Sequence, residues 1–590
     1  MDGTPILSVR GLTVSLGNTA VVHQLDFSVA AGSTLALVGE SGSGKSVTSL
    51  AIMRLLPERL GRVSGSIRLD GRELLALPEQ EMRRVRGGSI GMIFQEPMTS
   101  LNPVQRIGDQ IGEAIRVHRG LSGARLREAV LEMLRKVRIP DPEQRIDSFP
   151  HTFSGGMRQR VVIAMALACD PALIIADEPT TALDVTVQYQ ILELLREVQR
   201  ETGLALLFIT HDMGVVAELA DHVLVMRHGR EVEHGTACEV FSRPRDAYTR
   251  SLIEAAPSLV GKRAYHAATP RPVESLPPSL HGEEAALEVR GLSVRFPSRS
   301  GFFGRITGEV HAVEGVSFAI EKGQTLGLVG ESGSGKSTIG KAIIDLAPRH
   351  AGEVIVGGRR VDYRDPASLG SLRRDVQMIF QDPFGSLDSR QTIGSAIVEP
   401  MRVHRLEYGK AARLRMEWLL ERVGIDPARA ESLPHEFSGG QRQRICIARA
   451  LAMSPKVIVA DEAVSALDVA IKGQVIDLLI DLQREFDVAY LFISHDMSAI
   501  ERICDRVAVM YFGEIVEIGS RDDVIGRPGH DYTRRLLSAI PITHPDQRGK
   551  HPRSLVDGGP PRSPVRPLNY QPAPCGWDRL DDGHLIRRTA

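Results

Sequence analysis

Short runs of consecutive apolar residues recur along the chain, and most of them end in glycine or in an acidic residue. LALVG at residues 35–39 and LGLVG at 326–330 are each followed by a glycine-rich loop and then by a segment with helical periodicity. ALIIADE, ALLFITHD, KVIVADE and AYLFISHD are typical of strands in a parallel sheet that is covered on both faces. Amphipathic segments such as GARLREAVLEMLRKVRI lie between these runs and predict helices. The pattern therefore predicts an α/β fold.

The same landmarks occur twice. GESGSGKS stands at residues 39–46 and again at 330–337, an offset of 330 − 39 = 291. FSGGMRQR, which begins at Phe153, returns as FSGGQRQR at Phe437, an offset of 437 − 153 = 284, and the ADE and HDM segments repeat with the same offset of 284. Spacing that is kept over several landmarks indicates a duplicated domain.

A chain of 590 residues is too long for one hydrophobic core, because such cores stop growing near about 250 to 300 residues. We place the first domain at residues 1–256 and the second at 285–541. Residues 257–284 are rich in proline and lack apolar periodicity, which predicts a linker. The tail at residues 542–590 has a similar composition, and we expect it to lie on the surface or to be partly disordered.

Composition narrows the class of protein. A formal net charge of −1 gives no global basic field, so we expect no nucleic-acid partner. The longest apolar runs, such as residues 161–168, fall short of the roughly 20 residues that span a bilayer. The segment MDGTPILSVRGLTV lacks the basic and apolar regions of a secretory signal. We therefore expect the chain to stay in the cytosol without crossing a membrane.

Cysteine usage fits a reducing compartment. The five cysteines form no CxxC pair and so give no metal-ligand spacing; they are Cys169, Cys238, Cys446, Cys504 and Cys575. Cys169 and Cys446 lie in apolar helical runs, where core packing is the expected role.

The repeated GxxxxGKS pattern has the chemistry of a phosphate-binding loop. Its glycines allow successive backbone N–H groups to turn toward phosphate oxygens at the positive end of the following helix. Lys45 and Lys336 then reach the β- and γ-phosphates, and Ser46 and Ser337 offer hydroxyls to Mg²⁺. The expected nucleotide-binding residues of these loops are Gly39, Glu40, Ser41, Gly42, Ser43, Gly44, Lys45, Ser46 and Val47, and Gly330, Glu331, Ser332, Gly333, Ser334, Gly335, Lys336, Ser337 and Thr338.

An acidic pair ends one buried strand in each repeat. Mg²⁺ prefers hard oxygen ligands and the attacking water needs a base, so Asp177 and Asp461 fit the metal role and Glu178 and Glu462 the base role. Taken alone, such a pair is more often a solvated strand end. Its recurrence at 177 − 45 = 132 and 461 − 336 = 125 residues past the lysine favours the catalytic interpretation.

FSGGM and FSGGQ resemble the signature of ATP-binding cassette proteins. The resemblance implies two tandem phosphate-loop NTPase domains of the ABC type, each with a RecA-like mixed-sheet core and a helical subdomain. In that family the two domains pair head to tail around ATP. Ser438, Gly439 and Gly440 are then expected to complete the site on Lys45, and Ser154, Gly155 and Gly156 the site on Lys336.

Further positions carry over from the family one by one. Gln95 and Gln381 resemble the glutamine that senses Mg²⁺ and the attacking water, and His211 and His495 resemble the switch histidine that contacts the γ-phosphate. We therefore expect Gln95 and Gln381 at the metal as well as at the water. TALD and SALD resemble the loop that links the two sites; they span residues 181–184 and 465–468.

One expected group differs between the repeats. The aromatic residue on which adenine stacks in the family has Phe296 as its candidate in the second repeat, whereas Leu16 stands at that position in the first. We expect weaker ATP affinity at the Lys45 site. Both sites otherwise contain every expected group, so we expect both to hydrolyse ATP.

Two further features resemble bacterial peptide and nickel importers. These are the segments QEPMTSLNP and QDPFGSLDS, and the boxes RDAYTRSLIEAAP and HDYTRRLLSAIP. A fused pair of cassettes resembles the ATPases of glutathione and microcin import. This implies an ATPase at the inner face of the bacterial plasma membrane that works with two integral-membrane permease subunits and an extracytoplasmic substrate-binding protein. Dipeptides, oligopeptides, glutathione and nickel chelates all remain open as substrates.

Two alternatives bear on this interpretation, a soluble tandem cassette protein that acts on ribosomes or DNA and an efflux ATPase. Ribosome-associated tandem cassettes have a long, charged helical linker and DNA-repair members have zinc-binding cysteine pairs, and this sequence has neither. Drug-efflux ATPases remain a second alternative, against which the SLNP-type segments and the YTR boxes argue.

Some peptide importers hold an iron–sulfur cluster near the box. Four thiolates are the usual requirement for such a cluster, and the tail has only Cys575, so we expect no cluster.

Overall fold

The computed structural model of the chain describes residues 5–254, 271–273, 285–300, 305–550, 565–567, 570 and 576–588, except Glu58, Ala182, Ala466, Asp468 and Asp582. The chain forms two compact units. Unit 1 comprises Met1–Val260 and Pro541–Pro552, and unit 2 comprises Gly261–Ile540 and Arg553–Ala590. Each unit contains one copy of the repeat.

The main sheet of unit 1 has six strands, of which all but the edge strand β10 run parallel. Its central strands β7 and β8 are buried at every position, as their uninterrupted apolar sequences predict. The strand order is β10 (Arg230–Thr236), β9 (His222–Arg227), β3 (Thr34–Val38), β8 (Ala205–Thr210), β7 (Leu173–Asp177) and β6 (Ile90–Ile93).

A second, antiparallel sheet of unit 1 packs its apolar residues into the core that also contains one face of the main sheet. Its order is β2 (Thr19–Ala30), β1 (Pro5–Leu16), β4 (Gly61–Leu69) and β5 (Arg72–Glu73). The helices of the unit are α1 (Lys45–Ile52), α2 (Glu79–Gly88), α3 (Pro97–Ser100), α4 (Ile107–Arg119), α5 (Gly123–Lys136), α6 (Pro142–Arg145), α7 (Gly155–Leu167), α8 (Val185–Thr202), α9 (Met213–Leu219), α10 (Ala237–Ser242) and α11 (Ala247–Glu254).

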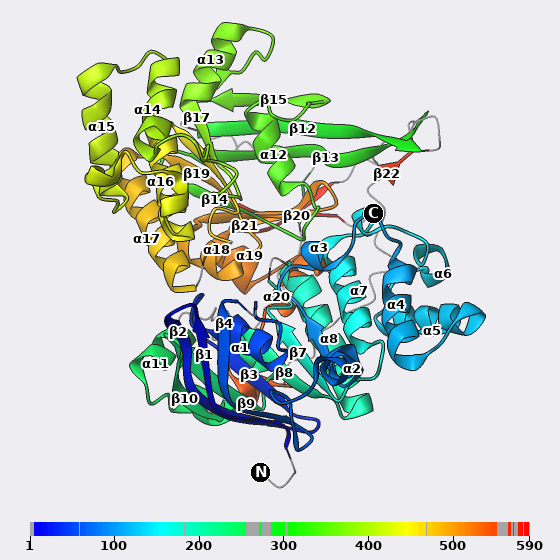
Figure 1. The fold of residues 1–590 in the computed structure, drawn as a ribbon. Helices are drawn as coiled ribbons and strands as arrows, with labels where there is room; N and C mark the ends of the chain where they lie inside the picture. Colours follow the sequence, from blue (N-terminus) through cyan, green and yellow to red (C-terminus); the bar gives the residue numbers. More distant parts are fainter. Residues whose placement is uncertain are drawn as a thin grey trace. The chain divides into compact units, whose positions relative to one another are not determined.

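Helices α4 and α5 form a helical subdomain against α7 (Figure 1). Ile111 and Leu134 from these two helices share a buried cluster with Val161 of α7 and Leu206 of the main sheet. The helical subdomain therefore shares its core with the main sheet. This shared cluster ties the position of α7 to the sheet that supports the phosphate loop.

Unit 2 repeats this arrangement. Its parallel strands are β14 (Thr325–Val329), β17 (Val376–Ile379), β18 (Val457–Asp461), β19 (Ala489–Ile493) and β20 (Arg506–Tyr511), with β21 (Glu514–Ser520) antiparallel beside β20. The second sheet contains β12 (Ala285–Ser300), β13 (Arg305–Glu321), β15 (Ala351–Val356), β16 (Arg359–Arg360) and β22 (Val565–Arg566). The helices are α12 (Lys336–Ile343), α13 (Pro366–Asp375), α14 (Ile393–Val403), α15 (Gly409–Arg422), α16 (Gly439–Leu451), α17 (Val469–Phe486), α18 (Met497–Ile503), α19 (Arg521–Gly526) and α20 (Asp531–Ser538).

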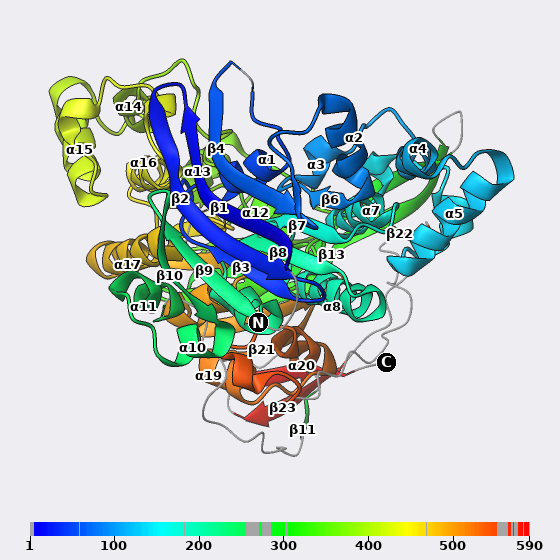
Figure 2. The ribbon, with the colours of Figure 1, turned by 60° about the horizontal axis from the view of Figure 1, so that its bottom comes forward.

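The sheet of unit 2 is extended by parts of the linker and of the tail. Strand β24 (His584–Arg587) pairs with β21, β23 (Trp577–Asp581) pairs with β24, and β11 (Arg271–Val273) pairs with β23 (Figure 2). The tail is anchored by a buried contact of 2.7 Å between His584 Nε2 and Glu517 Oε1. The composition of the tail did not predict these strands.

Residues 541–550 follow the second repeat in sequence but belong to unit 1. Ile542 is buried in a cluster with residues of α9 and α10, and its N–H donates to Glu218 Oε1 at 3.0 Å. Arg548 donates to the carbonyl oxygens of Ala217 at 2.7 Å and Ala220 at 2.6 Å. The guanidinium thus satisfies carbonyl groups at the C-terminal end of α9.

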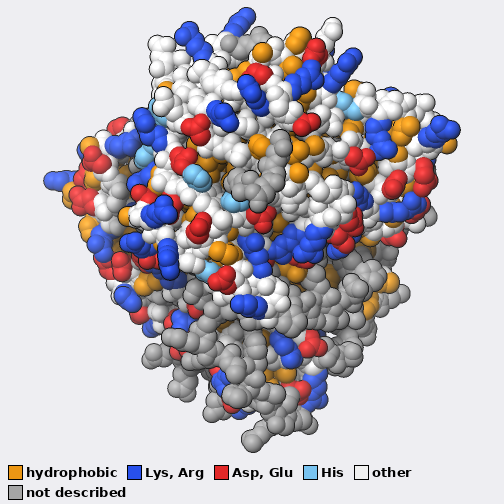
Figure 3. Space-filling model, turned by 90° about the horizontal axis from the view of Figure 1, so that it is seen from below, with side chains coloured by type: hydrophobic (Ala, Val, Ile, Leu, Met, Phe, Trp, Pro, Cys, Tyr) orange, Lys and Arg blue, Asp and Glu red, His pale blue; other side chains and the backbone are white. Residues whose placement is uncertain are grey.

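The surface and the cysteines add three observations. Acidic and basic side chains are intermingled on the face in Figure 3, in keeping with the near-zero net charge. Within the described part of the chain, no helix is both long and apolar enough to span a membrane. Cys446 is buried and Cys169 is half-buried, as their apolar surroundings predicted, while Cys575 lies outside the described residues.

Candidate active sites

The phosphate loop of unit 1 runs from the end of β3 to the start of α1. Gly39 has φ of 157°, and a Cβ there would lie 2.2 Å from the carbonyl oxygen of Met226, so only glycine fits. Gly44 precedes α1 in the left-handed conformation. Lys45 is buried, and its Nζ donates to the carbonyl oxygens of Gly39 at 2.7 Å and Glu40 at 2.8 Å. The ammonium group thus lies inside the loop, at the positive end of a helix.

The loop of unit 2 has the same geometry. Lys336 Nζ donates to the carbonyl oxygens of Gly330 at 2.8 Å and Glu331 at 2.7 Å. Gly330 again leaves no room for a Cβ, which would lie 2.2 Å from the carbonyl oxygen of Met510. Two loops of one geometry thus lie at the N-termini of α1 and α12, an arrangement suited to bind anions.

Each loop lies beside the carboxylate that ends a central strand. Ser46 Oγ donates to Asp177 Oδ1 at 3.0 Å, and Ser337 Oγ donates to Asp461 Oδ1 at 2.7 Å. Burial raises the pKa of both carboxyl groups, and the serine hydroxyls partly oppose that shift. A hydroxyl and a carboxylate side by side are the hard oxygen ligands that Mg²⁺ takes, so both pairs fit the metal role.

Glu178 is the second carboxylate of the candidate site in unit 1, and other predicted site residues lie within hydrogen-bond distance of it. Glu178 accepts from Gln95 Nε2 at 3.2 Å and from Thr181 Oγ1 at 2.9 Å, and His211 Nδ1 lies 3.1 Å from its Oε1. Burial acts to raise the pKa of Glu178, but the hydrogen bond and charge of His211 outweigh it and leave that pKa lowered. Burial acts to lower the pKa of His211, and Glu178 leaves it raised. Each shift favours the charged form of the group, as expected for a carboxylate and an imidazole in contact.

Unit 2 has the same cluster around Glu462. Gln381 Nε2 donates to Glu462 Oε2 at 2.7 Å, and His495 Nδ1 lies 3.3 Å from Oε1. Burial acts to raise the pKa of Glu462, and the hydrogen bond and charge of His495 leave it lowered. A lowered pKa favours the ionised carboxylate, the form that can accept a proton from water.

The signature segments begin helices. Ser154 caps α7 by accepting from the N–H of Met157, and Ser438 caps α16 by accepting from the N–H of Gln441. Ser154 and Ser438 are both exposed. They lie at helix N-termini, as expected.

The remaining expected residues are placed as follows. Asp184 is buried and caps α8, while Ala182, Ala466 and Asp468 of the two linking loops lie outside the described residues. Phe296 is partly buried and packs against the core of unit 2.

Sequence reasoning missed two tyrosines at these loops. Tyr248 Oη accepts from the N–H of Glu40 at 2.9 Å, and Tyr532 Oη accepts from the N–H of Glu331 at 3.0 Å. Both tyrosines stand in the YTR boxes, and the recurrence of those boxes was the only available signal.

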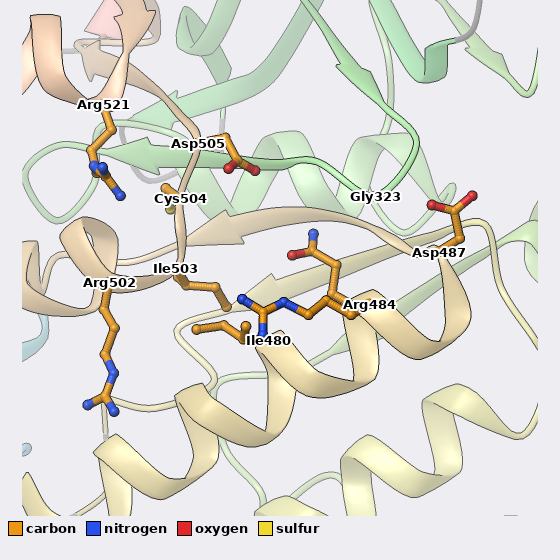
Figure 4. Close-up of a pocket in the computed structure, with 10 residues that line it drawn as sticks. Gly323, Ile480, Arg484, Asp487, Arg502, Ile503, Cys504, Asp505 and Arg521 are labelled. Carbon is orange, nitrogen blue, oxygen red and sulfur yellow. The ribbon is translucent and has the colours of Figure 1, made fainter.

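A separate cavity of about 340 Å³ in unit 2 is lined by residues such as Arg484, Arg502, Cys504 and Asp505 (Figure 4). None of the predicted site residues lines it. The cavity is lined by residues of α17 and α18, and it is separate from the phosphate loop of that unit.

Comparison with known proteins assigns the class. The family model for ABC transporters matches residues 22–181 and 313–465, and the model for the C-terminal region of oligopeptide/dipeptide transporters matches residues 232–278 and 516–559. The chain belongs to the ABC transporter family and is an ATP-binding, ATP-hydrolysing subunit of the peptide-importer type. The predicted fold class, two tandem ABC domains, is confirmed. The ribosome, DNA and efflux alternatives find no support in these matches.

Individual relatives are similar over nearly the whole chain. The chain is 53% identical to the glutathione import ATP-binding protein GsiA of Escherichia coli K12, over 99% of this chain and 97% of that protein. It is 54% identical to the protein of the same name from Shigella boydii, over 93% and 91%. A solved cassette, cbiO1 of Clostridium perfringens, is 24% identical over 43% of this chain and 95% of that chain, with a TM-score of 0.36. The assignment rests on the sequence matches.

Proposed function

We propose that the chain energises the import of glutathione or of similarly small peptides. The observation that carries this substrate class is the 53% identity to a glutathione import ATP-binding protein along both full lengths. The match to the C-terminal region of oligopeptide/dipeptide transporters, present after each repeat, supports peptides over nickel chelates.

Each site has the groups needed to hydrolyse ATP with Mg²⁺. In unit 1, Lys45 and the loop N–H groups would hold the phosphates. Ser46, Asp177 and Gln95 would hold Mg²⁺, which would supply neutralisation of the phosphate charge. Glu178 takes the proton of the attacking water, and His211 holds Glu178 in position. Ser337, Asp461, Gln381, Glu462 and His495 take the same roles in unit 2.

The two units pair head to tail in this proposal. Ser438, Gly439 and Gly440 then face the ATP on Lys45, and Ser154, Gly155 and Gly156 face the ATP on Lys336. Since ATP is held by both units only when they close, its binding free energy favours the closed state and hydrolysis removes that bias. The exposed helix N-termini at Ser154 and Ser438 are suited to bind phosphate oxygens.

Closure acts on partners in the membrane. We place the chain at the inner face of the bacterial plasma membrane, where two integral-membrane permease subunits contact the segments after Gln95 and Gln381. An extracytoplasmic binding protein delivers the substrate. The membrane-spanning path is assigned to these partners because the described part of the chain has no helix that could provide one.

Reconstitution tests this proposal. The tagged chain is purified from its native cells with its membrane partners, and the complex is placed in liposomes with the binding protein. We expect ATP-dependent uptake of labelled glutathione and of dipeptides, but not of nickel chelate, and none with the Glu178→Gln/Glu462→Gln variant. Uptake of nickel chelate alone, or purification with ribosomes in place of membrane proteins, would contradict the proposal.

A further inference from the structure

Two tyrosines outside the matched ABC regions contact the phosphate loops. Tyr248 lies in α11 and Tyr532 in α20, within the residues matched to the C-terminal region of oligopeptide/dipeptide transporters. Their positions are related by 532 − 248 = 284, the repeat offset found for the later landmarks. Each accepts a hydrogen bond from the second residue of its own loop, Glu40 or Glu331.

Both side chains are held firmly where they make this bond. Tyr248 is 6% exposed and packs in a cluster that includes Val38, the last residue of β3, while Tyr532 is 2% exposed. The Arg227 guanidinium lies 4.8 Å from the Tyr248 ring centroid, and at the equivalent position the Tyr511 ring lies 4.1 Å from that of Tyr532. Different neighbours thus cover the ring in the two units, but the hydroxyl has the same partner.

The bond fixes one peptide of the loop from outside. Lys45 contacts the carbonyl oxygen of Glu40 from inside the loop, whereas Tyr248 contacts the N–H of the same residue. When Lys45 turns to a phosphate, it no longer contacts the carbonyl oxygen of Glu40. The hydrogen bond from the N–H of Glu40 to Tyr248 then still fixes the position of Glu40. Phosphate binding depends on loop N–H groups that already point inward, so a preorganised loop binds at lower entropic cost.

We propose that Tyr248 and Tyr532 are positioning residues for ATP binding, through which the region after each cassette sets the shape of the phosphate loop. The hydroxyl of each tyrosine bonds to the phosphate loop, so we expect its effect to fall on nucleotide affinity and not on the hydrolytic step. The inference goes beyond the transport function and does not depend on which substrate is imported.

The test is nucleotide titration of Tyr→Phe variants with one site silenced. Tyr248→Phe is measured in a Lys336→Ala background and Tyr532→Phe in a Lys45→Ala background, with a fluorescent ATP analogue and Mg²⁺. Loss of one net hydrogen bond corresponds to about 0.5 to 1.5 kcal/mol, so we expect about 2- to 10-fold weaker binding in each case. In the full chain, we expect the KM for ATP to rise while kcat changes less than about twofold.

A matched control separates positioning from packing. Tyr490 is also buried in unit 2, but its hydroxyl donates to the carbonyl oxygen of Leu479 and does not contact the loop. Tyr490→Phe should lower the melting temperature without changing ATP affinity. If Tyr248→Phe and Tyr532→Phe bind the analogue as tightly as their parents, or lower kcat at constant KM, the proposal is overturned.

Discussion

At the scale of single residues, the backbone of the two glutamates is unusual. Glu178 has φ of 47° and Glu462 φ of 48°, in the left-handed region that non-glycine residues adopt at a cost. The N–H of Glu178 is fixed by the carbonyl oxygen of Ile209 at 2.9 Å, and that of Glu462 by Ile493 at 2.9 Å. Strain that recurs in both repeats at the same acidic residue supports a functional role for the direction of that side chain.

Glu178→Gln and Glu462→Gln should each abolish most ATP turnover. The amide keeps the shape of the side chain but cannot take a proton, and a general base contributes about 10²- to 10⁴-fold to a rate. Steady-state phosphate release measures turnover, and filter binding measures retained ATP. Glu132→Gln, on the exposed side of α5, is the control and should be silent. Near-normal turnover in either variant would refute the assignment of the base at that site.

The ion pair of His211 predicts a specific titration. In the absence of nucleotide and Mg²⁺, the pKa of His211 should lie above its ordinary 6.5, and in Glu178→Gln it should fall below 6.5 because burial remains. The pair's contribution to stability is fully present between the ordinary pKa values of 4.5 for Glu178 and 6.5 for His211. It is lost as pH rises through the raised pKa of His211, and also as pH falls through the lowered pKa of Glu178. NMR of histidine-labelled protein measures the pKa. An unchanged midpoint in Glu178→Gln would show that the pair is not charged.

The positions at which we expect adenine to bind predict unequal affinities of the two sites for ATP. Leu16 is the last residue of β1 and offers only apolar contact, whereas Phe296 offers a ring. Base stacking contributes about 1 to 3 kcal/mol in single-strand binding, which corresponds to about 5- to 150-fold weaker ATP binding at the Lys45 site. Titrations of Lys45→Ala and Lys336→Ala measure the two sites separately. Equal affinities would rule out this difference.

At the scale of elements, the sequence predicted the strands that support the sites and missed those at the edge. Strands β3, β7 and β8 are buried at every position and mainly apolar, because both faces of the sheet are covered. The residues at the ends of β3 and β7 lead into the candidate site. Strands β23 and β24 are short and polar in sequence. Their anchor, Glu517 with His584, depends on residues 67 positions apart, and no local pattern reports such a contact.

Arg548 should stabilise α9, the helix that follows His211. Charged hydrogen bonds contribute about 1.5 to 3 kcal/mol, so Arg548→Ala should speed hydrogen exchange in α9 about tenfold or more, while Arg548→Lys should restore part of the protection. Mass spectrometry of the full chain measures this, with α18 as the internal reference. Arg587→Ala, which breaks an ion pair with Glu514 in unit 2, is the control. Unchanged exchange in α9, or an equal rise in α18, would contradict the prediction.

At the scale of the whole molecule, duplication made the function predictable. A single GESGSGKS segment or acidic pair could occur without a function, but two sets of landmarks in the same order could not. The structure places Lys45, Asp177, Glu178 and His211 in unit 1, and their counterparts in unit 2. The sequence did not predict that residues 541–550 join unit 1, because Ile542 and Arg548 find their partners more than 300 positions away.

The most direct test of the account is a structure of the Glu178→Gln/Glu462→Gln variant with ATP and Mg²⁺. We expect two ATP molecules, one contacted by Lys45 and Ser438 and the other by Lys336 and Ser154. If each ATP were contacted by residues of one unit alone, with the signature serine of the other unit far from its γ-phosphate, the shared sites proposed here would be wrong.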